Sequence, residues 1–180
     1  MSKSQIRAWC KENLRRLRKQ SPAGSLPSFP VPELTSFLPS RPTQILVYLA
    51  TRWEPSSQEL IMYLWEDTYH EVFIPNTSDL SPAFTHFTPE TQLSKSQIGT
   101  FEDLTQEKIF RAGDFRSKSV CIVPCLGVSH ENFRLGYGSG FYDRFLAEFP
   151  GKSIGVVYQK NIVDFTPEDH DIPLDTIISW

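Results

Sequence analysis

Short apolar runs and helix-like patterns alternate along this 180-residue chain. Residues 44–50 (QILVYLA) form an unbroken apolar run of buried-strand length. Ser56 and Glu59 then have the spacing of a capping box, which opens a helix that carries apolar residues as far as Trp65. A second short strand is expected at 71–75. Together these segments predict a βαβ unit, in which a right-handed crossover joins two parallel strands.

Four more segments have the character of strands. Residues 83–87 alternate as an edge strand does, 119–124 are the most strand-like residues of the chain, and 154–158 and 175–179 follow. The polar stretch 88–118 shows no clean period. Strands that alternate with helices predict an α/β fold, with a mostly parallel central sheet flanked by helices in one domain. Ligands are expected at the C-terminal ends of its strands.

The N-terminus is predicted to form a basic helix over residues 2–19, where apolar residues recur at helical spacing. Lysine and arginine crowd its other positions, and Glu12 is the one acid. This pattern leaves two interpretations open, a solvated face or cations that reach a polyphosphate. Residues 21–42 hold six of the fourteen prolines. We therefore expect an irregular connector there, with helix limited to 33–38.

The composition is that of a globular protein, with 39% hydrophobic and 22% charged residues. A formal net charge of −3 gives no general reason to expect nucleic acid as a partner. No apolar run approaches the ~20 residues of a membrane span, and the N-terminus lacks the apolar core of a signal peptide. Cys10, Cys121 and Cys125 show no metal-ligand spacing. They are expected to be buried, reduced thiols of a cytoplasmic protein.

The strongest candidate for chemistry is the glycine-rich stretch 134–144 (RLGYGSGFYDR), followed by a helical pattern that Pro150-Gly151 ends. Such a loop points backbone N–H groups and the positive end of a helix dipole at one spot, which suits a phosphate. Arg134 and Arg144 offer guanidinium forks for phosphate oxygens. Asp143 is a natural ligand for a magnesium ion that bridges the phosphates. A plain glycine-rich turn before an ordinary helix fits the local pattern equally well.

Two common phosphate motifs are excluded. The dinucleotide-binding fingerprint needs G-x-G-x-x-G directly after a strand, whereas this loop reads G-x-G-x-G and no strand-like run precedes it directly. Gly151-Lys152-Ser153 ends like a Walker A loop, but Leu146 stands where the first glycine is required.

Four motifs in the C-terminal part of the chain resemble one known family. They are 122–127 (IVPCLG), 134–144 (RLGYGSGFYDR), 154–156 (IGV) and 170–175 (HDIPLD). In this pattern the chain is similar to the 5-formyltetrahydrofolate cyclo-ligase family, over nearly its whole length. The resemblance implies a single α/β domain that uses ATP and Mg²⁺ to convert 5-formyltetrahydrofolate to 5,10-methenyltetrahydrofolate, with release of ADP and phosphate. ATP would activate the formyl oxygen by phosphoryl transfer, and nitrogen 10 of the folate would then close the ring.

The resemblance also implies the site residues. Those for ATP are Lys3, Ser4, Gln5, Ile6 and Arg7 of the N-terminal helix, and Arg134, Leu135, Gly136, Tyr137, Gly138, Ser139, Gly140, Phe141 and Tyr142 of the glycine loop. Those for the folate substrate are Leu49, Glu54, Tyr137, Gly138, Ser139, Gly140 and Phe141. The implied catalytic residues are Arg134, Tyr142 and Arg144, and the implied magnesium ligands are Asp143 and Asp171. His170 is expected to fix its loop by hydrogen bonding rather than to act as a catalyst.

Several positions depart from the family pattern. Cys125 replaces a glycine, Val128-Ser129 replaces a Phe-Asp pair, Ser139 is the middle residue of a usual glycine run, and Asp103 stands where a proline is usual. Two alternatives therefore stay open beside the cyclo-ligase. One is a non-catalytic module that binds a folate or a nucleotide, and the other is a related ATP-dependent enzyme with another small acceptor. In each case the partner is a small molecule and the protein is expected to be a monomer.

Overall fold

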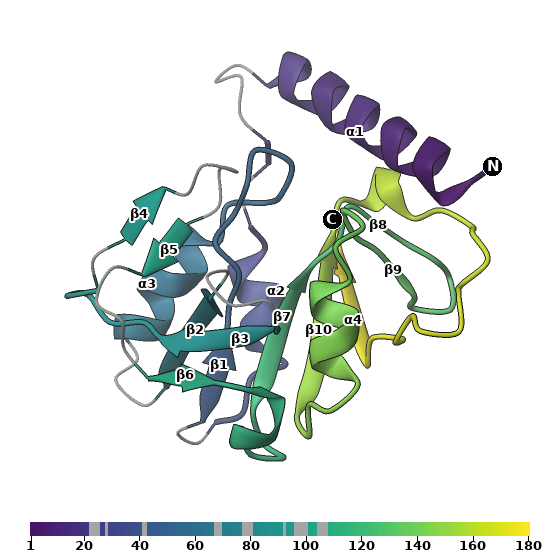
Figure 1. Ribbon diagram of the computed structural model, residues 1–180. Helices are drawn as coiled ribbons and strands as arrows, with labels where there is room; N and C mark the ends of the chain where they lie inside the picture. The colour runs from purple at the N-terminus through teal and green to yellow at the C-terminus, as the bar shows by residue number, and fades with distance from the viewer. Residues whose placement is uncertain are drawn as a thin grey trace.

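The structure is a computed structural model of the chain and describes residues 1–21, 26–27, 29–40, 43–66, 70–76, 81–91, 93–95, 101–103 and 108–180. A seven-stranded sheet, in the order β11-β10-β7-β1-β2-β3-β6, forms the centre of this described part (Figure 1). Its strands are β1 (Gln44–Leu46), β2 (Glu71–Asn76), β3 (Ala83–His86), β6 (Ile109–Phe110), β7 (Val120–Pro124), β10 (Lys152–Val157) and β11 (Thr176–Ser179). The strands from β11 to β2 are all parallel, so the predicted α/β fold with a mostly parallel sheet is confirmed.

The edge of the sheet differs from the prediction. The strand predicted as an edge, 83–87, is an inner strand, because β6 pairs with its outer side through Phe84 and Phe110. Only two residues make β6, which is too short to give a readable period within 88–118. The first strand is also shorter than the predicted 44–50, although the N–H of Val47 still donates to the carbonyl of Phe73 at 2.8 Å.

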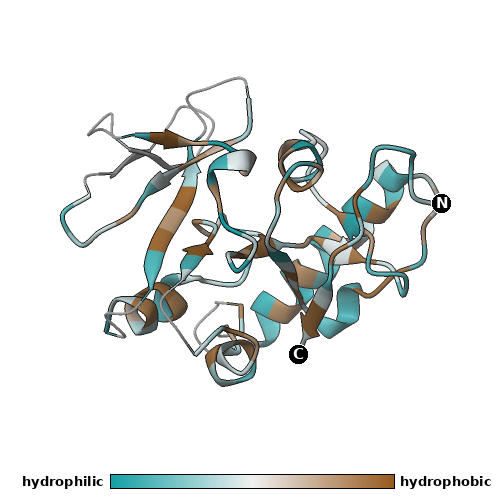
Figure 2. Ribbon diagram, turned by 90° about the horizontal axis from the view of Figure 1, so that it is seen from below, coloured by the Kyte–Doolittle hydropathy of each residue, from teal (hydrophilic) through white to brown (hydrophobic). Residues whose placement is uncertain are grey.

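Both faces of the sheet are covered, as expected for parallel strands. Alternate residues of one strand point to opposite faces, so Ile45 joins one apolar cluster and its neighbour Leu46 joins the other. The first cluster packs against α2 (Val31–Thr35) and α3 (Gln58–Glu66), and the second against α4 (Phe141–Leu146). In Figure 2 the strands are mostly apolar, and the helices around them carry polar colour on their outer sides.

The helix α1 (Lys3–Gln20) confirms the predicted basic helix and has a cluster of its own. Ile6, Cys10 and Leu14 pack in one cluster with Leu135 and with Leu126 and Tyr158, which follow the strands β7 and β10. The helix therefore lies over the C-terminal ends of the parallel strands (Figure 1). A capping box of Ser2 and Gln5 fixes its first turn.

Three helix boundaries differ from the prediction. In the connector, α2 covers Val31–Thr35 rather than 33–38. The helix α3 begins at Gln58, one residue later than the capping box implies, and Ser56 accepts a hydrogen bond from the N–H of Gln58 at 3.4 Å instead. The helix α4 has six residues, fewer than the two and a half turns expected before Pro150-Gly151, because looser turns complete the segment.

Small elements fill the remaining described segments. The two-stranded pairs are β4 (Leu93–Lys95) with β5 (Phe101–Asp103) and β8 (Gly127–Val128) with β9 (Arg134–Leu135), and the 3-10 turns are η1 (Ala112–Asp114) and η2 (Gln159–Asn161). Residues 22–25, 28 and 41–42 of the predicted connector lie outside the described residues. So do Gly99 and Thr100, which precede Asp103 in the turn that departs from the family pattern. No helix in the described part has both the length and the apolar character needed to cross a bilayer.

Candidate active site

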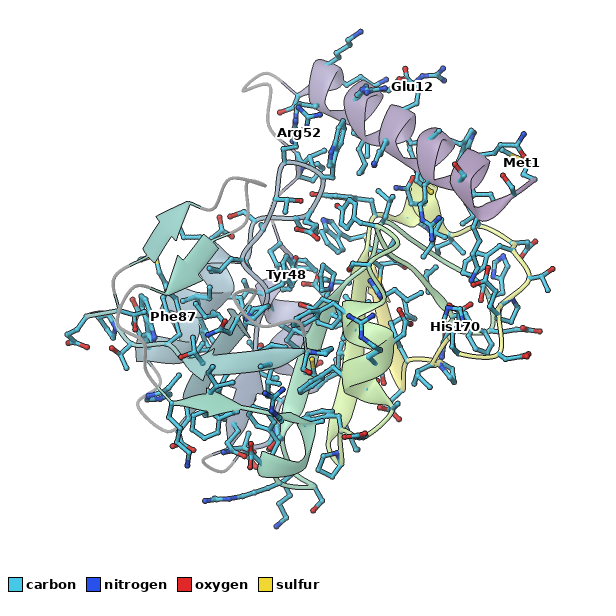
Figure 3. All side chains as sticks on the ribbon, in the orientation of Figure 1. Met1, Glu12, Tyr48, Arg52, Phe87 and His170 are labelled. Atoms are coloured by element: carbon cyan, nitrogen blue, oxygen red, sulfur yellow. The ribbon has the colours of Figure 1, made fainter. Side chains whose placement is uncertain are left out.

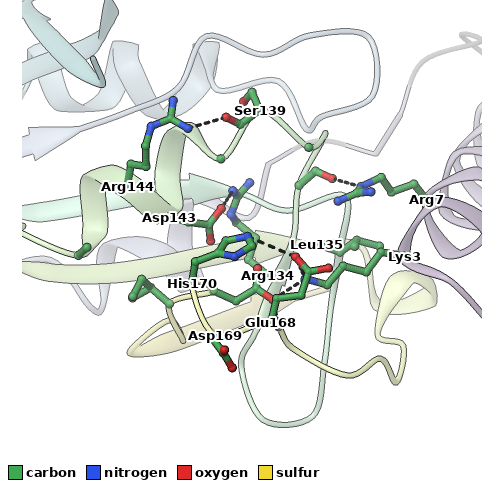
Figure 4. A pocket seen from close by; sticks show the side chains of 16 residues that line it. Lys3, Arg7, Arg134, Leu135, Ser139, Asp143, Arg144, Glu168, Asp169 and His170 are labelled. Atoms are coloured by element: carbon green, nitrogen blue, oxygen red, sulfur yellow. Dashed lines mark hydrogen bonds and ion pairs between the residues drawn. The ribbon is translucent and has the colours of Figure 1, made fainter. Parts of the chain in front are cut away.

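Three segments that are far apart in sequence line one cavity of about 710 Å³, called here the glycine-loop cavity (Figure 4). They are the start of α1, the stretch from β9 to α4, and residues 168–172 before β11, called here the acidic loop. The lining residues are Lys3, Arg7, Arg134, Leu135, Gly136, Gly138, Ser139, Gly140, Asp143, Arg144, Ala147, Glu168, Asp169, His170, Asp171 and Ile172.

Each glycine of the loop has its own structural reason. Gly138 has φ +104° and Gly140 has φ +66°, backbone conformations that residues with a Cβ adopt only with strain. Gly136 is needed for space instead, because a Cβ there would lie 2.2 Å from Nη1 of Arg134. The loop is therefore more than a generic turn, since Gly136, its first glycine, makes room for an arginine.

That arginine is the buried centre of the site. One guanidinium nitrogen of Arg134 donates to Oδ2 of Asp143 at 2.9 Å, and the guanidinium also lies 5.2 Å from the centre of the Tyr142 ring. The side chains of Arg134 and Asp143 are only 7% and 13% exposed. Nε of Arg134 and the hydroxyl of Tyr142 are buried and have no hydrogen-bond partner among the described residues. Arg134 also lines the cavity, and a buried cation there with donor capacity left over suits an anionic ligand.

The N-terminal helix contributes two further cations. Nζ of Lys3 lies 2.5 Å from Oδ2 of Asp171 and 3.4 Å from Oε2 of Glu168. Nε of Arg7 donates to the carbonyl of Gly136 at 2.8 Å and so ties α1 to the glycine loop. The structure thus selects two cations from the basic face of the helix and brings them to the cavity. Arg15 and Arg16, in contrast, are exposed and pair with Glu12.

The acidic loop is held in place by backbone contacts with the hairpin before the glycine loop. The N–H of Leu174 donates to the carbonyl of Asn132 at 3.0 Å, and Pro173 bridges to Phe133. Asp171 accepts a hydrogen bond from the N–H of Glu168 at 2.6 Å. Burial alone would raise the pKa of Asp171, but the hydrogen bonds from Lys3 and Glu168 outweigh it and lower that pKa. Asp171 is therefore held as a carboxylate.

The side chain of His170 contacts a neighbour in its own loop. Its Nε2 lies 3.3 Å from Oε2 of Glu168, and its side chain is 70% exposed. Glu168, His170 and Asp171 each offer one ligand atom, and these atoms lie within 4.8 Å of one another. One metal ion could therefore bind all three residues.

The donor set of the cavity fits a polyphosphate that carries a divalent cation. Its charged lining consists of four cations and four carboxylates, which are Lys3, Arg7, Arg134, Arg144, Asp143, Glu168, Asp169 and Asp171. Guanidinium and ammonium groups suit phosphate oxygens, and carboxylate oxygens suit Mg²⁺. Arg144 differs from the other cations, because it is exposed and donates to the carbonyl of Ser139 at 2.8 Å.

Two of the predicted folate residues, Leu49 and Glu54, do not line this cavity. Leu49 lines a mostly apolar hollow of about 520 Å³ with Trp65 and Phe87, whereas Glu54 lines one of about 410 Å³ in which polar and apolar surface are balanced. Both lie on the strand β1 side of the molecule, where Tyr48 and Arg52 are well away from His170 in Figure 3. Tyr137 connects the two sides, since burial and then the charge of Glu54 raise the pKa of its phenol.

Glu54 is an unusual carboxyl for a loop. It is 7% exposed, and its Oε2 accepts a hydrogen bond from the N–H of Thr51 at 2.7 Å. Burial raises its pKa, and the hydrogen bonds from Thr51 and the charge of Arg134 offset only part of that rise. A buried acceptor of this kind needs a partner, so Glu54 is not a solvated acid of the loop.

Two of the residues that depart from the family pattern, Cys125 and Ser129, have structural explanations. The thiol of Cys125 points into the core and would lie 3.2 Å from a Cβ at Gly155, so it fills the space that this glycine leaves. The hydroxyl of Ser129 accepts a hydrogen bond from the N–H of Phe133 at 3.1 Å and thereby closes the hairpin turn. Cys10, Cys121 and Cys125 are all free and buried, as predicted.

The structure brings together most of the predicted phosphate-side residues, but not all of them. Ser4 and Gln5 face solvent, Ile6 packs in the core, and Tyr137, Phe141 and Tyr142 do not line the cavity. In addition, Glu168 and Asp169 line it although the sequence did not single them out as site residues. Their position beside Asp171 in the acidic loop was the available signal.

Comparison with known proteins decides the family. The family model described as the 5-formyltetrahydrofolate cyclo-ligase family matches residues 2–179. The chain belongs to this family. A 5-formyltetrahydrofolate cyclo-ligase from Haemophilus influenzae is 30% identical over 142 residues, which cover 74% of each protein. One from Escherichia coli K12 is 25% identical over 142 residues, or 75% of this chain and 76% of the relative.

Two solved structures share the fold. The 5,10-methenyltetrahydrofolate synthetase of Mycoplasma pneumoniae has a TM-score of 0.67 and 21% identity, and covers 99% of this chain and 98% of its own. That of Aquifex aeolicus has a TM-score of 0.68 and 22% identity, and covers 99% and 90%. Members of the 5-formyltetrahydrofolate cyclo-ligase family are ATP-dependent ligases that convert 5-formyltetrahydrofolate to 5,10-methenyltetrahydrofolate, and family membership gives this chain the same activity.

Proposed function

We propose that this cyclo-ligase uses ATP with Mg²⁺ in the glycine-loop cavity to activate the formyl oxygen of 5-formyltetrahydrofolate. The observation that carries the proposal is the convergence of Lys3, Arg7 and Arg134 with Asp143 and Asp171 on one cavity. ATP would supply the γ-phosphoryl group that turns the formyl oxygen into a leaving group, and Mg²⁺ would neutralise phosphate charge. The protein's own part is then to position the reactants and to balance their charge.

Each cation has a distinct part in this proposal. Arg134, with an unpartnered Nε at the cavity wall, would hold phosphate oxygens in a fixed orientation because its own guanidinium is buried and paired. Lys3 and Arg7 would reach the phosphates from α1, and Arg144 would do so from the solvent side. Asp143 and Asp171 would hold the metal. Tyr142 would position Arg134, over which its ring lies, rather than contact the reacting atoms.

The folate would bind between Glu54 and the glycine loop. The buried carboxyl of Glu54 would accept hydrogen bonds from the amino groups of the pterin, with Leu49 beside it. Tyr137 reaches from the glycine loop toward Glu54, so we propose that residues from Tyr137 to Phe141 face the folate on one side and the nucleotide on the other. This placement puts the formyl group close to the phosphates, as the reaction requires.

The direct test mixes the purified protein with 5-formyltetrahydrofolate, ATP and Mg²⁺ and follows the near-ultraviolet absorbance of the methenyl product. The proposal expects product only when both ATP and the metal are present. Binding of folate or ATP by calorimetry without product would favour a binding module. Turnover of ATP with a different acceptor only would favour a related enzyme, and either result would contradict the proposal.

We further propose that residues 1–180 form one domain that acts as a monomer in the cytoplasm. The sheet that takes its strands from 44 to 179, together with the packing of α1 on it, supports a single domain. The three free, buried cysteines are compatible with a reducing compartment. Light scattering of the purified protein would test the monomer, and a dimer mass would contradict it.

A further inference from the structure

Several charged groups of the glycine-loop cavity are already paired with one another. Both carboxylates that are proposed to hold the metal contact a cation that is proposed to hold phosphate. Asp143 accepts from Arg134 at 2.9 Å, and Asp171 lies 2.5 Å from Nζ of Lys3. The two pairs come from different parts of the chain, yet both join a proposed metal ligand to a proposed phosphate ligand.

These two pairs differ from the surface ion pairs of the same protein. The side chains of Arg134 and Asp143 are 7% and 13% exposed, and those of Lys3 and Asp171 are 14% and 8% exposed. Arg15 and Glu12, in comparison, are 55% and 45% exposed. Water screens the surface pair, so its loss has little consequence. Separation of a largely buried pair leaves two poorly solvated charges, which is strongly unfavourable unless new partners replace the old ones.

Neither ligand alone can supply both sets of new partners. A divalent cation that binds Asp143 and Asp171 would displace Lys3 and Arg134 and leave these cations facing it without a counter-ion. A nucleotide that draws Lys3 and Arg134 to its phosphates would leave two bare carboxylates beside those phosphates. When both ligands bind, the carboxylates take the metal and the cations take the phosphates. All four side chains then exchange one counter-ion for another.

We infer that Lys3 and Arg134 are internal counter-ions that make the site select the metal–nucleotide complex over either ligand alone. This inference rests on the proposed function, because it takes the nucleotide and the metal to bind in the glycine-loop cavity. It assigns Lys3 a role in specificity beyond that of a phosphate contact. In the free protein its ammonium, which lies near Asp171 and Glu168, supplies Asp171 with the positive charge that the metal would bring.

Calorimetry without folate tests the inference on binding alone. ATP is titrated into the protein once with EDTA and once with excess Mg²⁺, and Mn²⁺ is titrated without nucleotide. For the wild-type protein we expect ATP to bind at least about tenfold more weakly in EDTA, within the usual range of coupling between two ligands. In Asp171→Asn, Lys3 is released from its partner, so ATP in EDTA should bind at least about fivefold more tightly than to the wild-type protein.

A double-mutant cycle separates counter-ion release from the simple loss of a negative charge. In the Lys3→Met background, Asp171→Asn should no longer improve binding of ATP in EDTA. The matched control is Asp169→Asn, which removes a charge from the same loop and cavity and should give a much smaller gain. An equal gain from Asp169→Asn, or a gain from Asp171→Asn that persists with Lys3→Met, would overturn the inference.

Lys3→Met gives a second and independent readout. Without Lys3, Asp171 and Glu168 lose their cation, so Mn²⁺ alone should bind at least about fivefold more tightly than to the wild-type protein. Unchanged Mn²⁺ binding would contradict the inference. Failure of the proposed function looks different, since the wild-type protein would then bind no ATP under either condition. If ATP binds equally with and without metal while the methenyl product still forms, only the counter-ion inference fails.

Discussion

The phosphate side and the folate side of this protein are built in different ways. On the phosphate side, segments around Lys3, Gly136 and Asp171 converge on one cavity and are already bonded to one another. On the folate side, Leu49 and Glu54 are only a few residues apart but line two separate hollows. The phosphate side is thus organised before any ligand binds, whereas the described residues of the folate side offer a buried acceptor beside two hollows.

This difference has a physical cause. Phosphate recognition depends on charge and on exposed backbone, which a glycine loop and a few ion pairs can hold in place. Recognition of a flat heterocycle depends on shape, and the hollows on the folate side are lined in part by exposed side chains such as Met62 and Arg52. The two sides should therefore respond differently to substitution. Changes on the phosphate side should remove function, and those on the folate side should tune it.

The largest effect is expected for Asp143→Asn. The substitution removes a proposed metal ligand and the negative partner of Arg134. Turnover should fall by roughly 100-fold or more, since metal-ion stabilisation of the transferring phosphoryl group is worth several kcal/mol. The measurement is the initial rate of methenyl formation across a range of Mg²⁺ concentrations.

Folate binding provides the internal control for that variant. If the two sides are separate, Asp143→Asn should bind 5-formyltetrahydrofolate within about twofold of the wild-type protein, because Leu49 and Glu54 line other hollows than the cavity of Asp143. Wild-type turnover in this variant would remove Asp143 from the metal site. An equal loss of folate binding would show that the two sides are one unit.

Arg134→Ala should have the next largest effect. Loss of a charged hydrogen bond to phosphate is expected to weaken ATP binding by about 1.5–3 kcal/mol. The measurement is the KM for ATP, which should rise. The matched control is Arg16→Ala, which removes an arginine that is 71% exposed on α1 and should leave that KM unchanged. A wild-type KM in Arg134→Ala would mean that this arginine only supports the fold.

The sequence predicted the features that depend on local pattern and missed those that depend on tertiary contacts. Parallel strands, the basic helix and the glycine loop follow from local pattern, and all of them are present. The edge strand β6 could not be predicted, because two residues give no period and only pairing with β3 defines it. Likewise, Glu168 and Asp169 join the site only because Pro173 and Leu174 anchor their loop to residues 132 and 133. Contacts of this kind are tertiary, and no local propensity encodes them.

Gly136→Ala tests how tightly the phosphate side is packed. A Cβ at this position would overlap the guanidinium of Arg134 at 2.2 Å, and the arginine cannot move away without losing Asp143. We expect a loss of roughly 1–2 kcal/mol in the free energy of unfolding, in the range of other overpacking substitutions. Gly113→Ala is the control, because a Cβ there meets no atom within 4 Å. Urea denaturation of both variants gives the comparison, and equal values would contradict a close-packed loop.

The smallest effect concerns how the free energy of unfolding depends on pH. It should have opposite signs for Glu54 on the folate side and Asp171 on the phosphate side. Burial raises the pKa of Glu54 above its usual value of 4.5, so the folded protein holds this proton more tightly than the unfolded chain does. The contribution of Glu54 to stability is therefore lost as the pH rises from 4.5 through the raised value. The pKa of Asp171 is lowered, so its contribution is present above the usual value of 3.8 and is lost as the pH falls through the lowered one.

Urea denaturation at a series of pH values tests this contrast. The stability of Glu54→Gln relative to the wild-type protein should increase as the pH rises, whereas that of Asp171→Asn should increase as the pH falls. Parallel curves for the two variants would mean that their carboxyls have the same surroundings, and the contrast between the two sides would then be wrong.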